Sequence, residues 1–520
     1  MEYINLDKSK AFQELKGMTR KSVKELLTKD RIEKAGIKLG GGLTYNYAAM
    51  SVSEEVISKL KDLAEEMDLV GKYKEILKGS VMNTGEKRLV LHHLTRGNVL
   101  GVKVEADGED KQAFYEGELE KIKAFSRDVH AGKIKGSTGK AFKTVCQIGI
   151  GGSDLGPRAL YLALKGNERK MNAEFISNVD PDDAAEVIGR LDFETTLFIL
   201  VSKSGTTQET LTNRDLVLET LKKSPVKGLV PNKHMVAVTS KTSPLAKDES
   251  LLKSFFIDDY IGGRYSSTSA VGGVVLSLAY GYDVFSSLLE GAHEEDVLSL
   301  NECPKENGAL MDALIGFYMR NIMGYPATAI LPYSQALSRF PAHLQQLDME
   351  SNGKHVNRFG EKIDYVTGPV IFGEPGTNGQ HSFYQLLHQG TDIVPLQFIG
   401  FKECQYGMDV ETDGSMSQTK LNANLSAQIV AFALGKDDDN PNKEFDGNRP
   451  SSLIYGEKLT PKALGALLAH YENKVMFQGF LWNLNSFDQE GVQLGKVLAK
   501  KVLKGCEGDE VLKAYADLLI

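Results

Sequence analysis

Short apolar runs alternate with longer amphipathic stretches from about residue 142 onward, and this alternation constrains the fold more than any other feature of the sequence. Thr144–Gly149, Leu197–Ser202 and Met235–Thr239 have the length and the residue types of buried strands, and helical patterns separate them. Strands that alternate with helices are typical of a parallel sheet. The pattern therefore predicts an α/β unit in this part of the chain.

A second set of the same kind follows after about residue 308, with candidate strands at Ala329–Leu331, Pro369–Phe372 and Val394–Ile399. The 520 residues exceed what one ordinary core holds, so at least two units are expected. The first hundred residues differ, because Ser51–Met67 carries apolar residues at helical spacing and no chemical motif. We therefore expect two α/β units with helical ends around them.

The composition is that of a folded globular protein. Hydrophobic residues make up 42% and charged residues 25% of the sequence, so each unit can bury a core. The formal net charge of −8 argues against a nucleic-acid partner, because proteins that bind phosphate backbones usually carry a basic excess. The four cysteines form no CxxC or Cys/His cluster, which excludes zinc-finger and redox-motif classes; they are Cys146, Cys303, Cys404 and Cys506.

The longest apolar stretches are too short to cross a membrane. Residues 270–280 and 425–434 fall below the roughly 18–20 residues that a spanning helix needs. The N-terminus mixes charges from its second residue onward and lacks the apolar core of a signal peptide. We therefore expect a cytoplasmic protein with no membrane partner.

A glycine-rich turn follows the first candidate strand, in residues 147–156. In open α/β sheets ligands bind beyond the carboxyl ends of the strands, and glycine lets the backbone approach a phosphate closely. Gly152 and Ser153 stand where a helix N-terminus would offer free N–H groups to an anion. The dinucleotide fingerprint GxGxxG fails, because Asp154 stands where its third glycine belongs. A phosphate site and an ordinary strand–helix turn both fit, and a nicotinamide cofactor is disfavoured.

A second turn, Ser202–Glu209, follows the next candidate strand. Its hydroxyl groups surround one predicted helix N-terminus and form a cage of donors sized for one phosphate; they belong to Ser202, Ser204, Thr206 and Thr207. Lys203 would be a nearby charge or a direct ligand, and no GxxxxGK[ST] motif surrounds it, which argues against a nucleoside triphosphate. The alternative is a capping box between Thr206 and Glu209, which leaves the other hydroxyls without a role.

Candidates for acid–base chemistry lie downstream. Arg264 stands in a glycine-rich turn and can offer paired donors to an anionic oxygen, although a structural salt bridge would also explain it. Gln346 and Glu350 are four residues apart in a predicted helix, so an amide and a carboxylate share one face. The alternative for Glu350 is a solvated side chain at a helix end.

His381 stands at the predicted start of a helix, Ser382–His388, just after a Gly-Thr-Asn-Gly stretch. A helix N-terminus disfavours the imidazolium, so this histidine would stay neutral and could accept a proton. A histidine that caps or packs against the helix start fits as well. For His388 we expect packing or surface exposure, since no HExxH motif or third ligand indicates a metal.

The last candidates lie near the C-terminus. Asp488 is a plausible N-cap of a helix on which Gln489 and Lys496, seven residues apart, face the same way. At that spacing Lys496 also neighbours Val492 and Leu503, so its stem is expected to be partly buried. A solvated lysine is the alternative.

Six segments, taken together, resemble the glucose-6-phosphate isomerase family in order and in wording. The most specific are DMESNGK from residue 348, GEPGTNGQHSFYQLLHQG from residue 373 and NSFDQ.GV.LGK from residue 485. With the two turns and the arginine-containing turn they cover the chain from about residue 145 to 500. This resemblance favours the functional interpretation of Arg264, Glu350, His381 and Lys496 over the alternatives.

The resemblance implies a fold of two sugar-isomerase (SIS) type α/β/α subdomains with parallel sheets. A helical N-terminal segment (1–105) would pack with the large subdomain, and the small subdomain would span 106–285. The large subdomain would span 286–485, and a C-terminal helical arm 486–520. The resemblance also implies a homodimer in which His381 reaches the partner's site.

The implied reaction interconverts glucose 6-phosphate and fructose 6-phosphate through an enediol, without metal or organic cofactor. Glu350 would move the proton between C2 and C1, Arg264 would steady the enediolate, and His381 and Lys496 would assist ring opening. The groups implied to hold the sugar or its phosphate are Gly152, Ser153, Ser202, Lys203, Ser204, Gly205, Thr206, Thr207, Gln346 and Gln489.

The chain departs from the family pattern at Ser204-Gly205, where Thr-Phe is common, which puts the local shape of the phosphate loop in doubt. Two other functions stay open. A sugar-phosphate sensor on the same subdomains would keep the hydroxyl cage but would not need Glu350, His381 and Lys496 together, and it would carry a basic DNA-binding segment. A related isomerase or aminosugar-phosphate enzyme would act on a different substrate.

Overall fold

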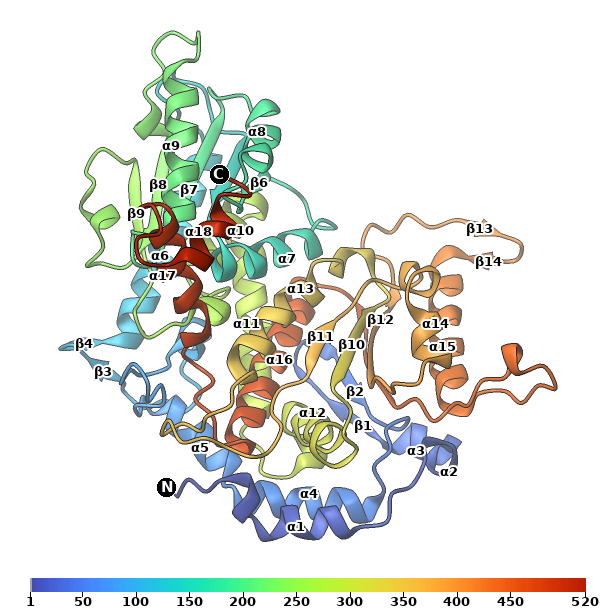
Figure 1. Cartoon of the computed structure of the whole chain (residues 1–520). Coiled ribbons are helices and arrows are strands. Elements are labelled where there is room, and N and C mark those ends of the chain that lie inside the picture. Colours follow the sequence, from blue (N-terminus) through green and yellow to red (C-terminus); the bar gives the residue numbers. More distant parts are fainter. Residues whose placement is uncertain (1) are drawn as a thin grey trace.

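The computed structural model, which describes residues 2–520, places the predicted strands in two separate sheets (Figure 1). The smaller sheet is wholly parallel, with strand order β6-β5-β7-β8-β9. Two of its inner strands, β7 and β8, are buried along their whole length, as the apolar runs predict. The strands are β5 (Thr144–Ile148), β6 (Asn172–Ile176), β7 (Thr196–Val201), β8 (Met235–Thr239) and β9 (Lys253–Phe256).

Helices cover both faces of the small sheet. One face packs on α8 (Pro181–Gly189) and α9 (Gln208–Lys222), and the other on α6 (Lys111–His130), α7 (Leu155–Ala163) and α10 (Ala270–Tyr280). Because both faces of the sheet are covered, these strands are continuous apolar runs and do not alternate between apolar and polar residues.

The larger sheet has the order β1-β2-β15-β12-β10-β11. Its last four strands are parallel, whereas β1 and β2 form an antiparallel hairpin that pairs with β15. The N-terminal segment is therefore not helical throughout, since this hairpin extends the large sheet. The strands are β1 (Gly36–Lys38), β2 (Thr44–Asn46), β10 (Ala327–Pro332), β11 (Val370–Phe372), β12 (Leu396–Glu403) and β15 (Ser451–Lys458).

The large sheet is also covered on both faces, so the prediction of two three-layer α/β units is confirmed. One face packs on α14 (Tyr384–Gln389) and α15 (Ser417–Leu434). The other face belongs to the main core, whose helices are α11 (Tyr282–Leu298), α12 (Gly308–Phe317), α13 (Phe340–Gln345) and α16 (Pro461–Leu481).

The terminal parts surround these units. The helix expected near Ser51–Met67 is α4 (Glu54–Glu66), and Ser53 caps it by accepting a hydrogen bond from the Val56 backbone N–H. The other N-terminal helices are α1 (Lys10–Gly17), α2 (Val23–Leu26), α3 (Lys29–Lys34) and α5 (Leu69–Leu77). Two short hairpins are β3 (Glu105–Ala106) with β4 (Glu109–Asp110), and β13 (Glu411–Thr412) with β14 (Ser415–Met416).

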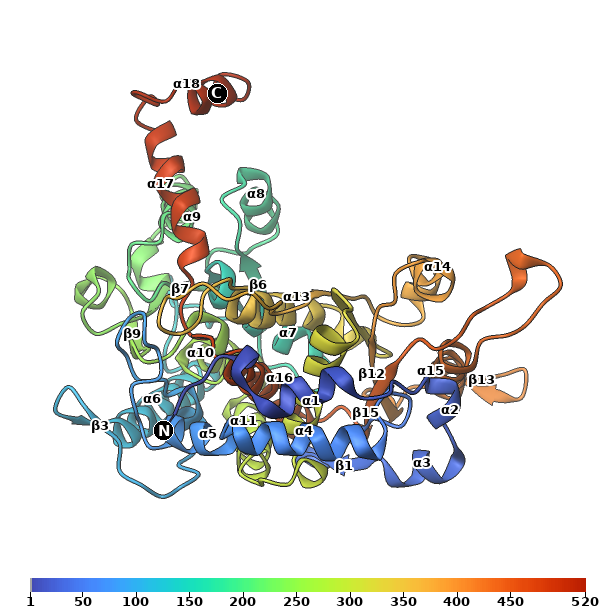
Figure 2. The same cartoon turned by 60° about the horizontal axis from the view of Figure 1, so that its bottom comes forward.

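The C-terminal arm, residues 486–520, contains α17 (Gln493–Val502) and α18 (Glu510–Ala516) and projects away from the body (Figure 2). No residue of α17 or α18 is buried. Among residues 2–520, no helix is both long enough and apolar enough to cross a membrane.

Candidate functional site

A cavity of about 460 Å³ lies where β5 and β7 end, between the small sheet and the start of the C-terminal arm. The carboxyl ends of parallel strands are where open α/β sheets bind ligands. Most of the predicted site residues line this one cavity. They are Gly152, Ser153, Ser202, Lys203, Ser204, Thr207, Arg264, Gln346, Glu350, Gln489 and Lys496.

The glycine-rich turn lies against the arginine-containing turn. Gly152 is in the 3-10 turn η4 (Gly151–Ser153), and a Cβ there would lie 2.2 Å from the carbonyl of Gly263. Only glycine permits this contact, which brings Arg264 beside the first turn. The predicted strand–helix turn therefore has a packing role and also lines the cavity.

The hydroxyls of the second turn are arranged in pairs. The Ser202 and Thr207 side-chain oxygens are 2.9 Å apart, and the Thr206 hydroxyl donates to Ser204 Oγ at 3.0 Å. Thr207, not Thr206, is the N-cap residue of α9, and it makes no side-chain capping bond. The alternative of a Thr206–Glu209 capping box is therefore wrong, because the helix begins one residue later.

Two predicted members of the phosphate loop do not line the cavity, namely Gly205 and Thr206. Gly205 has a φ of +68°, a left-handed conformation, and a Cβ at this position would lie 2.8 Å from Ser243 Oγ. A phenylalanine, common here in the family, does not fit this backbone. The glycine of Ser204-Gly205 therefore suits the left-handed backbone of this loop.

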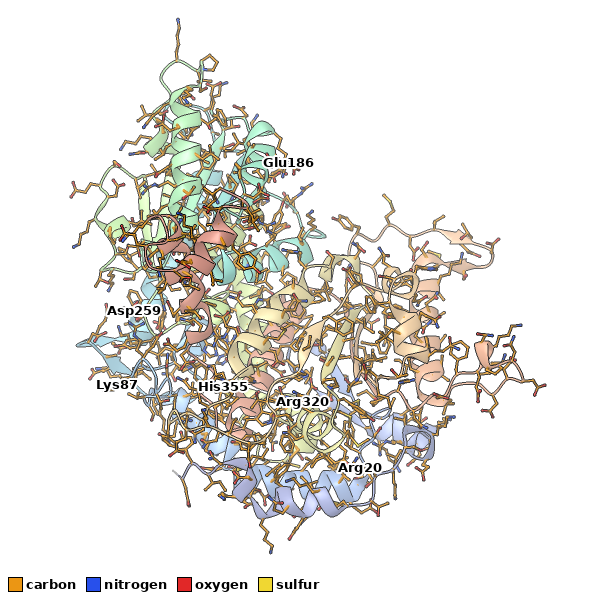
Figure 3. All side chains as sticks on the ribbon, in the orientation of Figure 1. Arg20, Lys87, Glu186, Asp259, Arg320 and His355 are labelled. Atoms are coloured by element: carbon orange, nitrogen blue, oxygen red, sulfur yellow. The ribbon has the colours of Figure 1, made fainter. Side chains whose placement is uncertain are left out.

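Lys203 lies at the side of the cavity and is half-buried. Its ammonium donates to the carbonyl oxygen of Ile261 at 3.1 Å and to that of Asp259 at 3.4 Å, and Asp259 is labelled in Figure 3. Burial lowers the pKa of this lysine. Two carbonyl oxygens hold the Lys203 ammonium in place, and its positive charge lies beside the hydroxyl cage.

Arg264 is 2% exposed, and its guanidinium is fixed on several sides. Nε donates to Ser351 Oγ at 2.7 Å, and Nη2 donates to the carbonyl oxygens of Ser486 at 2.6 Å and Asp488 at 3.0 Å. Nη1 points into the cavity, at 3.3 Å from Gln489 Oε1 and 3.4 Å from Glu350 Oε1. The arginine therefore combines structural hydrogen bonds with one nitrogen directed at the cavity.

Gln346 and Glu350 are the ends of a π-helical turn, η11 (Gln346–Glu350), that continues α13. Such wide turns occur often at functional sites. Both side chains line the cavity, as their four-residue spacing predicts. The Glu350 side chain is 23% exposed and paired with Arg264, so it is not simply a solvated residue at a helix end.

His381 does not join this cavity. It is exposed and ends a 3-10 turn, η12 (Asn378–His381), and α14 begins only at Tyr384, so the predicted position at a helix start is wrong. Within residues 2–520 its side chain has no hydrogen-bond partner and no salt-bridge partner. His388 stacks on Phe432, with ring centroids 3.7 Å apart, and this packing confirms the structural interpretation of that residue.

The C-terminal candidates are arranged differently from the expectation. Asp488 does not cap a helix, because its carboxylate pairs with Lys354 Nζ at 2.5 Å and the first turn of the arm, η14 (Glu490–Val492), follows Gln489. Lys496 lies on α17 with an exposed side chain at the rim of the cavity, so its stem is not buried. No residue of α17 is buried, which explains the difference.

A second cavity of about 960 Å³ adjoins the first and shares Gln346, Glu350, Gln489 and Val492 with it. Lys354 and His355 line it, and His355 is labelled in Figure 3. Sequence reasoning missed Ser351 and Lys354, although both lie in the specific segment that contains Glu350. Across residues 2–520, no group of three or more His, Cys, Asp and Glu side chains is placed to hold a metal ion.

Comparisons with known proteins identify the family of the chain. The family model "Phosphoglucose isomerase" matches residues 46–517. The chain is 61% identical to a glucose-6-phosphate isomerase of Treponema denticola, with all of both chains covered, and 49% identical to one of Borreliella burgdorferi, with 100% and 99% covered. The crystal structure of a glucose-6-phosphate isomerase from Chlamydia trachomatis matches with a TM-score of 0.93 at 42% identity, covering 99% of each chain. The chain therefore belongs to the phosphoglucose isomerase family.

Proposed function

We propose that this chain is an aldose–ketose isomerase that interconverts D-glucose 6-phosphate and D-fructose 6-phosphate through an enediolate, in glycolysis and gluconeogenesis. Membership of the family and the relatives at up to 61% identity support this function. The observation that carries it is the pair Arg264 and Glu350, 3.4 Å apart in a cavity bordered by a hydroxyl cage. A base, a fixed cation and an anion site are the three parts that the reaction needs.

The phosphate of the substrate would bind at the second turn. Hydroxyl and backbone N–H groups at a helix N-terminus favour an oxyanion, and the Lys203 ammonium adds positive charge. Ser153 and Gly152 would border the phosphate from the first turn. Gly205 and Thr206 would act through the shape of the loop, since neither lines the cavity.

Glu350 would act as the base. A single carboxylate can take a proton from C2 and return it to C1, because the two carbons are adjacent. Removal of that proton places negative charge on the sugar oxygens, and Arg264 Nη1 is fixed where it can stabilise this charge. Gln346 and Gln489 would hold the sugar hydroxyls between the base and the phosphate site.

Ring opening would fall to His381 and Lys496, which requires a second copy of the chain. We propose a homodimer in which His381 of one protomer enters the site of its partner. The exposed His381 and the 960 Å³ cavity next to Glu350 support this arrangement. The arm supports it too, because it exposes apolar side chains that a monomer leaves in water, among them Leu494, Val511 and Tyr515.

We also propose that the chain divides into the units 1–105, 106–285, 286–485 and 486–520, and that the enzyme is cytoplasmic. The two covered sheets and the projecting arm support the division. The four free cysteines agree with a reducing compartment.

Conversion of fructose 6-phosphate to glucose 6-phosphate tests the proposal, with purified protein after treatment with EDTA and beside Glu350→Gln. We expect rapid turnover by the wild type and a loss of about 10³-fold or more in kcat in the variant, because the base is removed without a change of size. A wild type that binds sugar phosphate without turnover would support the sensor instead.

A further inference from the structure

We infer that Lys354 is a positioning residue for the isomerisation: it holds the turn of residues 485–488 in the place that directs Arg264 at Glu350. The inference rests on the proposed function, because it takes Glu350 as the base and Arg264 as the cation that stabilises the enediolate. Lys354 itself lies behind the reacting groups and lines only the larger of the two cavities.

Within residues 2–520, every hydrogen bond of the Lys354 ammonium goes to the turn. Nζ donates to Asp488 Oδ1 at 2.5 Å, to the Asp488 carbonyl oxygen at 3.3 Å and to the carbonyl oxygen of Asn485. The Lys354 and Asp488 side chains are 15% and 14% exposed, so water screens this pair only weakly. One ammonium therefore ties together both ends of a four-residue turn.

The same segment holds the middle of the turn. Ser486 Oγ donates to Asn352 Oδ1 at 2.7 Å, two residues before Lys354. Gly85 closes the opposite side, since a Cβ there would lie 2.8 Å from Asp488 Oδ2. The turn therefore has little freedom to move while Lys354 is paired.

The turn of residues 485–488 fixes Arg264. The carbonyl oxygens of Ser486 and Asp488 accept both hydrogen bonds of Nη2, and Ser351, next to Glu350 in the chain, accepts from Nε. These contacts connect the three parts of the site. The segment that carries Glu350 holds the turn, the turn holds Arg264, and Arg264 faces Glu350. Loss of Lys354 leaves the Asp488 carboxylate without its cation and frees the two carbonyl oxygens that direct Nη1.

Lys354→Met tests the inference, because it keeps the length of the stem and removes the charge. We expect kcat to fall by about 10–100-fold, since a shift of about 1 Å in a catalytic group has effects of this size, while KM changes by less than about 3-fold. Lys362→Met is the matched control, because Lys362 is an exposed lysine of the same loop region. Equal kcat values in the two variants would overturn the inference.

A binding measurement separates positioning from general damage to the fold. Sorbitol 6-phosphate shares the phosphate and hydroxyl contacts of the substrate, whereas a five-carbon aldonate phosphate places a carboxylate where the enediolate charge develops. By calorimetry we expect Lys354→Met to weaken the aldonate at least about 10-fold and sorbitol 6-phosphate less than about 3-fold. An equal loss for both ligands would identify Lys354 as a merely structural residue and overturn the inference.

Asp488→Asn tests the inference where Lys354→Met does not fold, and a double-mutant cycle extends the test where it does. Asp488→Asn alone should lower kcat by a similar factor, and the double variant should be no worse than either single one, because all three lose the same clamp. A double variant whose loss of kcat equals the product of the two single losses would overturn the inference.

Glu350→Gln, measured in parallel, keeps the two proposals apart. Full activity in that variant contradicts the proposed base, whatever the activity of Lys354→Met.

Discussion

Asp348 and Glu350 lie two residues apart on one π-helical turn, and their surroundings give them different properties. Glu350 is partly exposed and faces the Arg264 guanidinium. Asp348 is buried, and its Oδ1 has no hydrogen-bond partner within residues 2–520. Burial raises the pKa of Asp348 to about 7, although the charge of Lys474 opposes this shift. The burial of Asp348 thus sets its protonation on this turn.

This difference predicts a pH-dependent stability. The folded-state pKa of Asp348 is raised above its ordinary value of 3.8, so the folded protein retains a proton that the unfolded chain loses, and its contribution to stability falls as pH rises from about 4 to 7. Asp348→Asn removes this pH-dependent fall in stability, because an amide does not ionise. The unfolding free energy of the variant minus that of the wild type should rise with pH by up to about 4 kcal/mol across this window. Urea denaturation at several pH values measures it, and a difference that stays constant with pH would contradict the assignment.

Gly205 gives a second prediction for a single residue. Gly205→Ala places a Cβ at a φ of +68° and within 2.8 Å of Ser243 Oγ, so the phosphate loop has to shift. We expect KM for fructose 6-phosphate to rise about 10-fold, which corresponds to the 1–2 kcal/mol that a left-handed conformation costs a non-glycine residue. Gly189→Ala is the control, because no atom lies within 4 Å of its Cβ position. An unchanged KM in Gly205→Ala would show that the loop shape does not affect binding.

Residue types and spacing predicted much of the site, namely the hydroxyl cage and the shared face of Gln346 and Glu350. The two partners of Arg264 Nη2 were not predictable, because they are carbonyl oxygens more than 200 residues away in the sequence. Asp488 was misassigned for a related reason. An aspartate before a helical pattern resembles an N-cap, and only the fold shows that its carboxylate forms an ion pair with Lys354.

At the scale of elements, α16 is buried along nearly its whole length and still carries charged side chains. Glu472 on this helix accepts a hydrogen bond from Arg96 Nη1 at 2.6 Å, and Asp296 on α11 accepts from Arg96 Nε at 2.6 Å. All three side chains are fully excluded from solvent. Arg96 thus ties the N-terminal segment to two central helices.

Arg96→Met tests this connection between elements. It leaves two buried carboxylates without their cation, and such a loss costs about 3–5 kcal/mol of unfolding free energy. Arg127→Met on the exposed side of α6 should cost less than about 0.5 kcal/mol, since its side chain is 68% exposed. Urea unfolding curves of both variants provide the measurement. Equal stabilities would show that the buried pairs contribute little.

Most of the strands that the sequence predicted are interior strands, where two covered faces favour apolar runs, although the predicted β11 lies at the edge of the large sheet. The interior strand β15 was not predicted, because polar residues begin and end its sequence, SSLIYGEK. The small-sheet edge strands β6 and β9 escaped notice because they include Asn172, Glu174, Lys253 and Ser254, and a strand with one free edge tolerates polar residues. The β1–β2 hairpin was missed because its strands have only three residues each. Pairing with β15, a partner distant in sequence, stabilises it.

At the scale of the whole molecule, the proposed dimer makes each active site depend on both protomers. In one chain, Glu350 and Lys496 line the cavity and His381 lies outside it. One chain supplies both the base Glu350 and the cation Arg264. It is nevertheless expected to need its partner for ring opening. The wild type should sediment at twice its mass of 57.1 kDa.

Complementation between two inactive variants tests the shared site. Heterodimers of His381→Asn with Glu350→Gln contain one site with an intact Glu350 and an intact partner histidine. A mixture made by co-expression should recover about a quarter of wild-type activity, because half of the dimers are mixed and half of their sites are complete. If His381 serves the site of its own chain, no heterodimer has a complete site and no activity returns.

The central claim is that Glu350 moves a proton through an enediolate, and hydrogen isotope exchange tests it most directly. Glucose 6-phosphate and fructose 6-phosphate are equilibrated with the enzyme in D₂O and followed by NMR. The account predicts that the wild type introduces deuterium at C2 of the aldose and C1 of the ketose over many turnovers, and that Glu350→Gln loses exchange and isomerisation together. Isomerisation without any exchange, or exchange that persists at the wild-type rate in Glu350→Gln, would contradict it.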